Sequence, residues 1–133
     1  MKKNQIILEK FRLPLFKAVI WVIVSPTVSQ GIDYVEDLTT HRIASEKEKK
    51  SIEVYTYAYE TEDGKKRYML FFNPKSKPGA IAHEVKHLIN ILFSWHGYRL
   101  SLSNDEMECY YLEDMVDRVF NILKKYKKLN QIG

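Results

Sequence analysis

The sequence has too little cysteine and too short an apolar run for several classes of protein. Cys109 is the only cysteine in 133 residues, so no disulfide framework can form within the chain and a reducing compartment is expected. The longest apolar run, residues 18–24, is far short of the ~20 residues that cross a bilayer. There is no internal repeat and no low-complexity linker. These absences favour one domain over residues 1–133 that does not span a membrane.

The start of the chain fits a secretory signal peptide poorly. The first residues are basic, but Glu9, Lys10, Arg12 and Lys17 interrupt the apolar segment that a signal peptide needs. No small-residue cleavage site follows them. We therefore expect a cytoplasmic protein.

The excess of positive charge is small and does not indicate a nucleic-acid partner. The formal net charge is +4, with 21 basic and 17 acidic residues interspersed. Much of the excess lies in Lys124, Lys125, Lys127 and Lys128, at the end of a predicted helix, where cations complement the helix dipole. We expect neither nucleic acid nor a membrane as a partner.

The pattern of apolar residues predicts an α+β fold. Residues 18–24 are β-branched and apolar throughout, as in a central strand buried on both faces, whereas residues 5–12 fit an edge strand or a helical turn. Residues 27–40 have helical periodicity, and the charged residues 41–51 are interpreted as a solvated connection. Residues 52–59 and 67–73 flank Asp63-Gly64 and predict an antiparallel hairpin. We expect a small mixed sheet of about three strands, packed by three helices. The helices are expected over residues 27–40, over residues 78–97 and from Ser103 to Leu129.

The central motif is HEVKH at residues 83–87, on a strongly helical and otherwise apolar segment. Residues four apart share one helix face, so His83 and His87 form a narrow polar stripe with Asn90 and Ser94. Burying two imidazoles costs free energy unless each has a partner, and one shared zinc ion provides a partner for both. A chance match to His-Glu-x-x-His is expected in roughly one chain in a hundred of this composition. The motif predicts a zinc site.

This segment resembles the gluzincins, the thermolysin-like and aminopeptidase-like zinc peptidases, over residues 83–110. In those families a glutamate on the next helix is the third zinc ligand, at nearly the spacing of the 18 residues that separate His87 from Glu106. The order of strand, HExxH helix and second helix over residues 67–126 looks like a minimal zincin. It also resembles small zincin-type proteins encoded by phages and mobile elements, in which a similar Asn-Asp-Glu follows the motif.

The resemblance implies that His83, His87 and Glu106 bind Zn²⁺ and leave a fourth position for water. Glu84 would then act as the general base that takes a proton from this water as it attacks a carbonyl. Glu106 has an alternative interpretation, because residues 103–106 also match a capping box in which Glu106 bonds back to Ser103. Asp105 and Glu108 are the other candidate ligands.

Two functions are compatible with these residues. The first is a zinc metallopeptidase that hydrolyses a peptide or protein substrate, with residues 67–73 as a possible sheet edge for an extended chain. The alternative is a zincin-fold module that keeps the metal for stability and binds a partner without turnover. The complete motif favours the enzyme. Glu84 is not needed to hold zinc, so a module that only binds a partner would have little reason to keep it. Thermolysin-like sequences place an aspartate four residues after the glutamate, where this chain has Tyr110. Tyr110, Tyr111, Tyr98 and His96 are candidates for oxyanion stabilisation, and none of them is assigned. The oligomeric state is left open.

Overall fold

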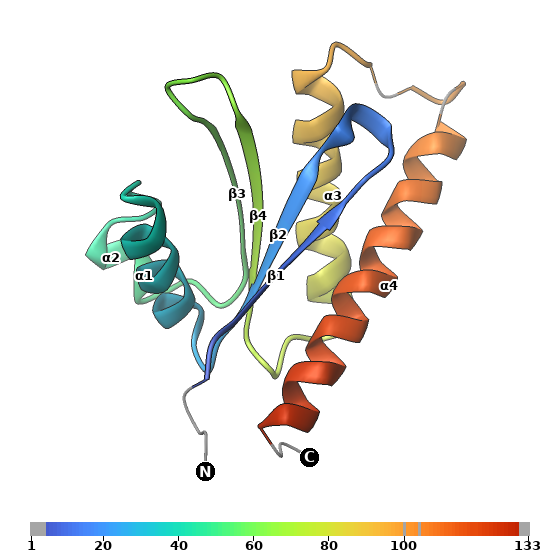
Figure 1. Cartoon of the computed structure of the whole chain (residues 1–133). Helices are drawn as coiled ribbons and strands as arrows, with labels where there is room; N and C mark the ends of the chain where they lie inside the picture. Colours follow the sequence, from blue (N-terminus) through green and yellow to red (C-terminus); the bar gives the residue numbers. More distant parts are fainter. Residues whose placement is uncertain (1–4, 100, 104, 131–133) are drawn as a thin grey trace.

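The structure is a computed structural model that describes residues 5–99, 101–103 and 105–130 (Figure 1). It is a mixed α+β domain with one four-stranded sheet. The elements in chain order are β1 (Ile7–Arg12), a 3-10 turn η1 (Leu15–Lys17), β2 (Val19–Val24), α1 (Val28–Thr39), α2 (Glu46–Lys49), β3 (Tyr55–Glu60), β4 (Lys66–Phe72), α3 (Pro78–Trp95) and α4 (Asp105–Leu129).

The sheet has the strand order β1-β2-β4-β3 and is mixed. β2 and β4 run parallel at the centre, β1 pairs antiparallel with β2, and β3 pairs antiparallel with β4. The expected hairpin of β3 and β4 is therefore confirmed, and Gly64 turns it with a φ of +88°. The expected number of about three strands is one too few, because the mixed polarity of residues 5–12 did not distinguish the edge strand β1 from a helical turn.

Helices cover both faces of the sheet, which explains why β2 is apolar throughout (Figure 1). Ile20, Val22 and Val24 point to the face under α3 and α4, while Trp21 and Ile23 point to the face under α1. Successive side chains of a strand alternate between faces, so a central strand between two layers of helices needs apolar residues at every position.

The helix expected over residues 27–40 is α1. Thr27 caps it, since its hydroxyl accepts a hydrogen bond from the Gln30 N–H and its own N–H donates to the Gln30 side chain. Gly31 allows close approach to the sheet, because a Cβ there would lie 2.6 Å from Ser25 Oγ. Glycine within this helix is thus required by packing, although it lowers helix propensity.

The charged connection of residues 41–51 is not wholly solvated, and this expectation is corrected at Lys49. That side chain is only 4% exposed, and its Nζ lies 2.8 Å from Asp33, 2.6 Å from Glu36 and 3.1 Å from Glu46. A lysine can be buried when carboxylates surround its charge. Three carboxylates from α1 and α2 do so here, and the short helix α2 is held against α1.

The other layer consists of α3 and α4, the two helices expected from the sequence. Pro78 opens α3, and Gly97 follows its end with a φ of +78°, as in a left-handed cap. α4 buries an apolar stripe that includes Met115, Val119 and Tyr126. No helix among the described residues is long and apolar enough to span a membrane.

Candidate functional site

α3 presents the two motif histidines on its open side, between the edge strand β3 and the helix α4. Successive residues of a helix are rotated by about 100°, so Glu84 and Lys86 lie on either side of the two histidines. Glu84 contacts β3, and Lys86 contacts α4. The apolar residues of α3 face the core, so the polar stripe of His83, His87 and Asn90 stays exposed.

The structure brings His83 and His87 together. Their Nε2 atoms are 3.1 Å apart, and the rings meet edge to face. Two nitrogens that each lie about 2.0–2.1 Å from one tetrahedral zinc ion would be about 3.3 Å apart. The imidazoles therefore already have the separation that a shared ion requires, on adjacent turns of a rigid helix.

Glu84 is the buried member of the motif and is only 7% exposed. Its Oε1 accepts a hydrogen bond of 2.6 Å from the hydroxyl of Thr56 on β3, and its Oε2 lies 3.8 Å from His83 Nε2. The carboxylate is thus fixed on one side and turned toward the histidine pair on the other. This is the placement that a general base beside a metal ion needs.

Sequence reasoning missed Thr56. The signal was present, because the side chains of residues 54–59 alternate: Tyr55, Tyr57 and Tyr59 pack on the α1 side, while Val54 and Ala58 pack on the α3 side. Thr56 shares the α3 side and is the polar residue among small apolar ones. A hydroxyl at that position needs a partner, and Glu84 provides one.

The carboxylates at the start of α4 differ in direction. Glu106 precedes the buried Met115 by nine residues, or two and a half turns, so it lies on the opposite side of α4 and is exposed. Glu108 precedes Met115 by seven residues, close to two turns, so it lies on the side that faces α3. Its side chain is 13% exposed.

Lys86 pairs with Glu108 across the contact between α3 and α4. Its Nζ forms an ion pair with Glu108 Oε1 and also donates a hydrogen bond of 3.0 Å to Asn90 Oδ1. Lys86 directly precedes His87 in the chain. Glu108, which the sequence left as an alternative ligand, is therefore the α4 carboxylate that contacts the helix of the motif.

Within the described residues, no three histidine, cysteine, aspartate or glutamate side chains converge as a metal-binding group. The structure brings together two of the expected ligands, His83 and His87, with Glu84 beside them. The capping alternative for Glu106 includes Asn104, which lies outside the described residues.

The residues considered for oxyanion stabilisation have other contacts. His96 stacks on Phe16 with ring centroids 4.2 Å apart, and its Nδ1 lies 2.8 Å from the Leu92 carbonyl oxygen. Tyr98 packs against the same Phe16 ring. Tyr110 is 64% exposed and meets Tyr111 edge to face. None of these contacts directs a hydroxyl or imidazole toward the histidine pair.

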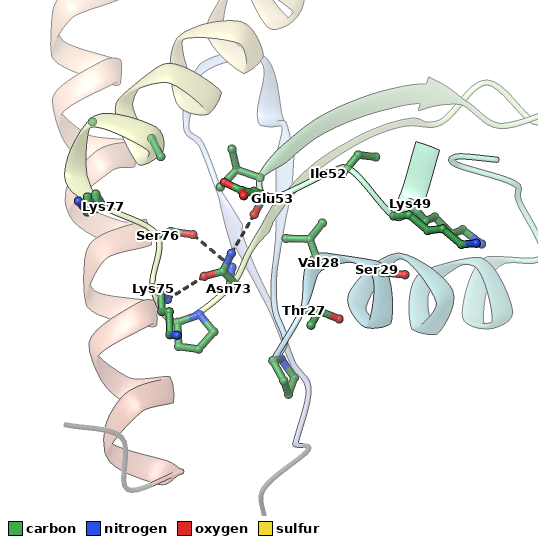
Figure 2. A pocket seen from close by; sticks show the side chains of 16 residues that line it. Thr27, Val28, Ser29, Lys49, Ile52, Glu53, Asn73, Lys75, Ser76 and Lys77 are labelled. Carbon is green, nitrogen blue, oxygen red and sulfur yellow. Dashed lines mark hydrogen bonds between the residues drawn. The ribbon is translucent and has the colours of Figure 1, made fainter. Parts of the chain in front are cut away.

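A cavity of about 1020 Å³ lies beside the first turn of α3. It opens at the carboxyl ends of the parallel strands β2 and β4. There β2 leads into α1 and β4 leads into α3, and these two helices lie on opposite faces of the sheet. Crevices of this kind are common ligand sites in sheets with parallel strands. Figure 2 shows Asn73 at its centre, where the side chain donates to the Glu53 carbonyl and accepts from the Lys75 N–H. Its lining includes Gly79 and Ala80, the turn just before His83.

The sheet edge next to the motif is β3. The expectation that residues 67–73 form an edge is wrong, because β4 pairs with β2 on one side and β3 on the other. β4 is apolar from Tyr68 to Phe72 for the same reason as β2, since helices cover both of its faces. The strand next to α3 that can accept a further strand is β3.

Comparison with known proteins assigns no family: no protein-family model, no curated protein and no solved structure matches this chain. Its function must be inferred from its own residues.

Proposed function

We propose that the protein is a zinc-dependent metallopeptidase that hydrolyses a peptide bond at the His83–His87 pair. The observation that carries the proposal is the pair of Nε2 atoms 3.1 Å apart, with the buried Glu84 carboxylate 3.8 Å from one of them. A pair of histidines alone, or a buried carboxylate alone, would not indicate a reaction. Two converging imidazoles beside a carboxylate that β3 holds in place form a site suited to hydrolysis.

The donor set fits zinc. Two neutral imidazoles and one carboxylate are the ligands of a catalytic zinc site with an open position, whereas structural sites are closed and rich in cysteine. The single cysteine, Cys109, is exposed on α4 and is not part of the motif. A bound zinc ion would polarise a carbonyl and lower the pKa of a water molecule to about 7.

The residues of the chain have separate roles in this proposal. His83 and His87 would hold the ion, and Glu84 would accept the proton of the attacking water and pass it to the leaving amine. Thr56 orients Glu84 through the 2.6 Å hydrogen bond. The third ligand comes from the start of α4. Glu106 is the residue that the gluzincin resemblance implies, and Glu108 is the one that contacts α3.

The substrate would bind as an extended chain along β3. This strand is an edge of the sheet and lies next to the α3 turn that carries Glu84. Extended peptides add to exposed sheet edges through main-chain hydrogen bonds. The arrangement of sheet edge, HExxH helix and following helix supports a zincin-like domain of gluzincin type. The proposal includes an origin in a phage or mobile element.

The test combines metal analysis with a peptide-cleavage assay. Protein loaded with one equivalent of zinc is incubated with a diverse peptide pool, and new termini are identified by mass spectrometry. Glu84→Gln should keep its zinc and lose cleavage by at least about a hundredfold, because it removes only the proton acceptor. Glu62→Gln, the same change in the exposed β3–β4 turn, should cleave as the wild type does.

The outcomes separate the two functions. Cleavage that survives in Glu84→Gln would contradict the assigned base. Stoichiometric zinc without cleavage of any peptide would favour the metal-stabilised binding module, and absence of zinc binding would contradict both.

A further inference from the structure

A second cavity, of about 550 Å³, lies between the amino ends of β2 and β4. Its lining combines residues of η1, β1 and the β3–β4 turn. Five of its side chains are cations, and the described lining contains no aspartate or glutamate. The cations are Lys10, Lys17, Lys65, Lys66 and Arg67.

These charges are only partly neutralised by their surroundings. Lys65 and Lys66 each lie 3.9 Å from an exposed carboxylate, of Asp63 and Glu60 respectively. Such long, exposed pairs contribute little. In the part of the chain that the structure describes, no carboxylate lies within 4.0 Å of the other three cations of this cavity. The cavity therefore carries a net positive charge.

Aromatic rings hold two of the cations in place. Lys10 Nζ lies 4.3 Å from the centre of the Trp21 ring, and the Arg67 guanidinium lies 5.2 Å from the same ring. Arg67 also donates a hydrogen bond of 3.0 Å to the Tyr59 hydroxyl. Trp21 points to the face of the sheet under α1, so these two cations lie on that side of the cavity.

The hydroxyl of Tyr68 points independently to a ligand. Tyr68 is 1% exposed and lines the cavity, and its Oη has no hydrogen-bond partner among the described residues. Burial, and secondarily the charge of Glu60, raises the pKa of Tyr68 to about 12, so the group is a proton donor at neutral pH. Buried donors without an acceptor are rare in proteins, and a bound oxygen atom would satisfy this one.

The backbone at the rim is strained. Phe16 and Lys17 both have left-handed φ angles, of 63° and 52°. Residues other than glycine seldom adopt this conformation, and it is maintained at functional sites more often than elsewhere. Here it places Lys17 at the cavity.

We propose that this cavity binds the phosphoryl group of a small anionic compound. Lys66 lies two residues before Tyr68 in β4 and therefore on the same side of the sheet, so its charge and the Tyr68 hydroxyl would contact the phosphoryl oxygens. Lys10 and Arg67, on the Trp21 side, would attract the anion at longer range. The volume is in the range of small-molecule pockets, roughly 300–1,000 Å³. A nucleic-acid backbone fits less well, because stacking of bases needs free ring faces. Lys10 and Arg67 already contact the Trp21 ring, and His96 stacks on Phe16.

Inorganic pyrophosphate is the probe, titrated into the full chain by calorimetry without divalent metal and at constant ionic strength. We expect saturable binding with one site per chain. Tyr68→Phe should weaken it by about tenfold or more, the effect of one hydrogen bond to a charged group. The same variant should melt at or above the wild-type temperature, because it removes a hydroxyl that has no partner in the protein.

Three further variants make the result specific. Lys66→Gln should weaken binding, whereas Lys128→Gln, which removes the same charge from an exposed position on α4, should not. His83→Ala should bind pyrophosphate like wild type, which separates this cavity from the proposed zinc site. Equal losses in Lys66→Gln and Lys128→Gln, or unchanged affinity in Tyr68→Phe, would overturn the proposal. Displacement of pyrophosphate by a single-stranded oligonucleotide without terminal phosphates would assign the site to a nucleic-acid backbone and overturn it as well.

Discussion

At the scale of single residues, the hydroxyl of Thr56 determines where the Glu84 carboxylate points. Thr56 Oγ1 lies 2.6 Å from Glu84 Oε1 and 3.0 Å from the Glu84 carbonyl oxygen, so its one proton is directed at this residue. A buried carboxylate that loses such a partner reorients or takes up water. The strand β3 thus contributes to the site although it carries none of the motif.

Thr56→Val removes the hydroxyl and keeps the shape of the side chain. We expect kcat for peptide cleavage to fall by about tenfold or more, since the proton acceptor is no longer held in place. Zinc affinity and KM should change little, because the change removes no proposed zinc ligand and keeps the backbone of β3. Thr56→Ser is the matched control and should restore most of the rate. Full activity in Thr56→Val would show that Glu84 is held by other contacts.

The identity of the third ligand is also decided by single side chains. Glu108→Gln should lower zinc affinity by more than about a hundredfold if Glu108 binds the ion, a larger loss than the 10–100-fold of residues that only support a ligand. Lys86→Met is the control, because it breaks the same Lys86–Glu108 ion pair and leaves the carboxylate available. Competition with a chromogenic zinc chelator measures each affinity.

Glu106→Gln completes this comparison. Glutamine also serves as the third residue of a capping box, so the change should spare a cap and remove only an anionic ligand. A large loss in Glu106→Gln with none in Glu108→Gln would assign the ligand to Glu106 as the gluzincin resemblance implies. Ser103→Ala should cost about 0.5–2 kcal/mol of stability if the cap is present and leave zinc affinity unchanged.

At the scale of elements, Glu36 joins α1 to the segment that contains α2. Its Oε2 accepts hydrogen bonds from the N–H groups of Ile43 and Ala44, and its Oε1 accepts one from Lys49. Burial would raise the pKa of Glu36, but the bond from Lys49 and the two backbone bonds outweigh it and lower the pKa below 4.5. The contribution to stability is therefore present above that value and is lost as pH falls through the lower folded value.

Glu36→Gln tests this junction. We expect a loss of roughly 1.5–3 kcal/mol at pH 7, the range for hydrogen bonds to a charged group. The difference from wild type should shrink at pH 3, where the wild-type carboxylate is increasingly protonated. Urea denaturation at both values measures it, with the exposed Asp37→Asn on the same helix as control. A difference that is equal at both values would show that the charge of Glu36 does not stabilise the fold.

The elements themselves could largely be predicted from sequence. β2, α1, the β3–β4 hairpin, α3 and α4 follow from periodicity and from turn residues such as Gly64, because these are local properties of the chain. The burial of Lys49 could not be predicted, because its three carboxylate partners become neighbours only when α1 and α2 pack. The same applies to Thr56 and Glu84, which are 28 residues apart.

At the scale of the whole molecule, the parallel pair β2–β4 has a cavity at each of its ends. The cavity of about 1020 Å³ opens at the carboxyl ends of these strands, next to the start of the motif helix, and the basic cavity lies at their amino ends. The residues His83, Glu84 and His87 line neither cavity, because their helix α3 carries them between β3 and α4. The sequence predicted the histidine site from the local HEVKH motif. The basic cavity is made of cations from three separate segments and has no local pattern.

Zinc should stabilise this whole domain. Because His83 and His87 come together only when α3 is formed, an ion that binds them binds the folded chain and adds its binding free energy to stability. At free zinc 100-fold above Kd the gain is about 2.7 kcal/mol. For a domain of this size that corresponds to roughly 10 °C in Tm. We expect about one zinc per chain in protein purified without chelator, and a Tm that falls by this amount when a chelator is added. The double variant His83→Ala/His87→Ala should melt at the lower temperature with or without chelator. A wild-type Tm that does not change when the chelator is added would contradict the zinc site.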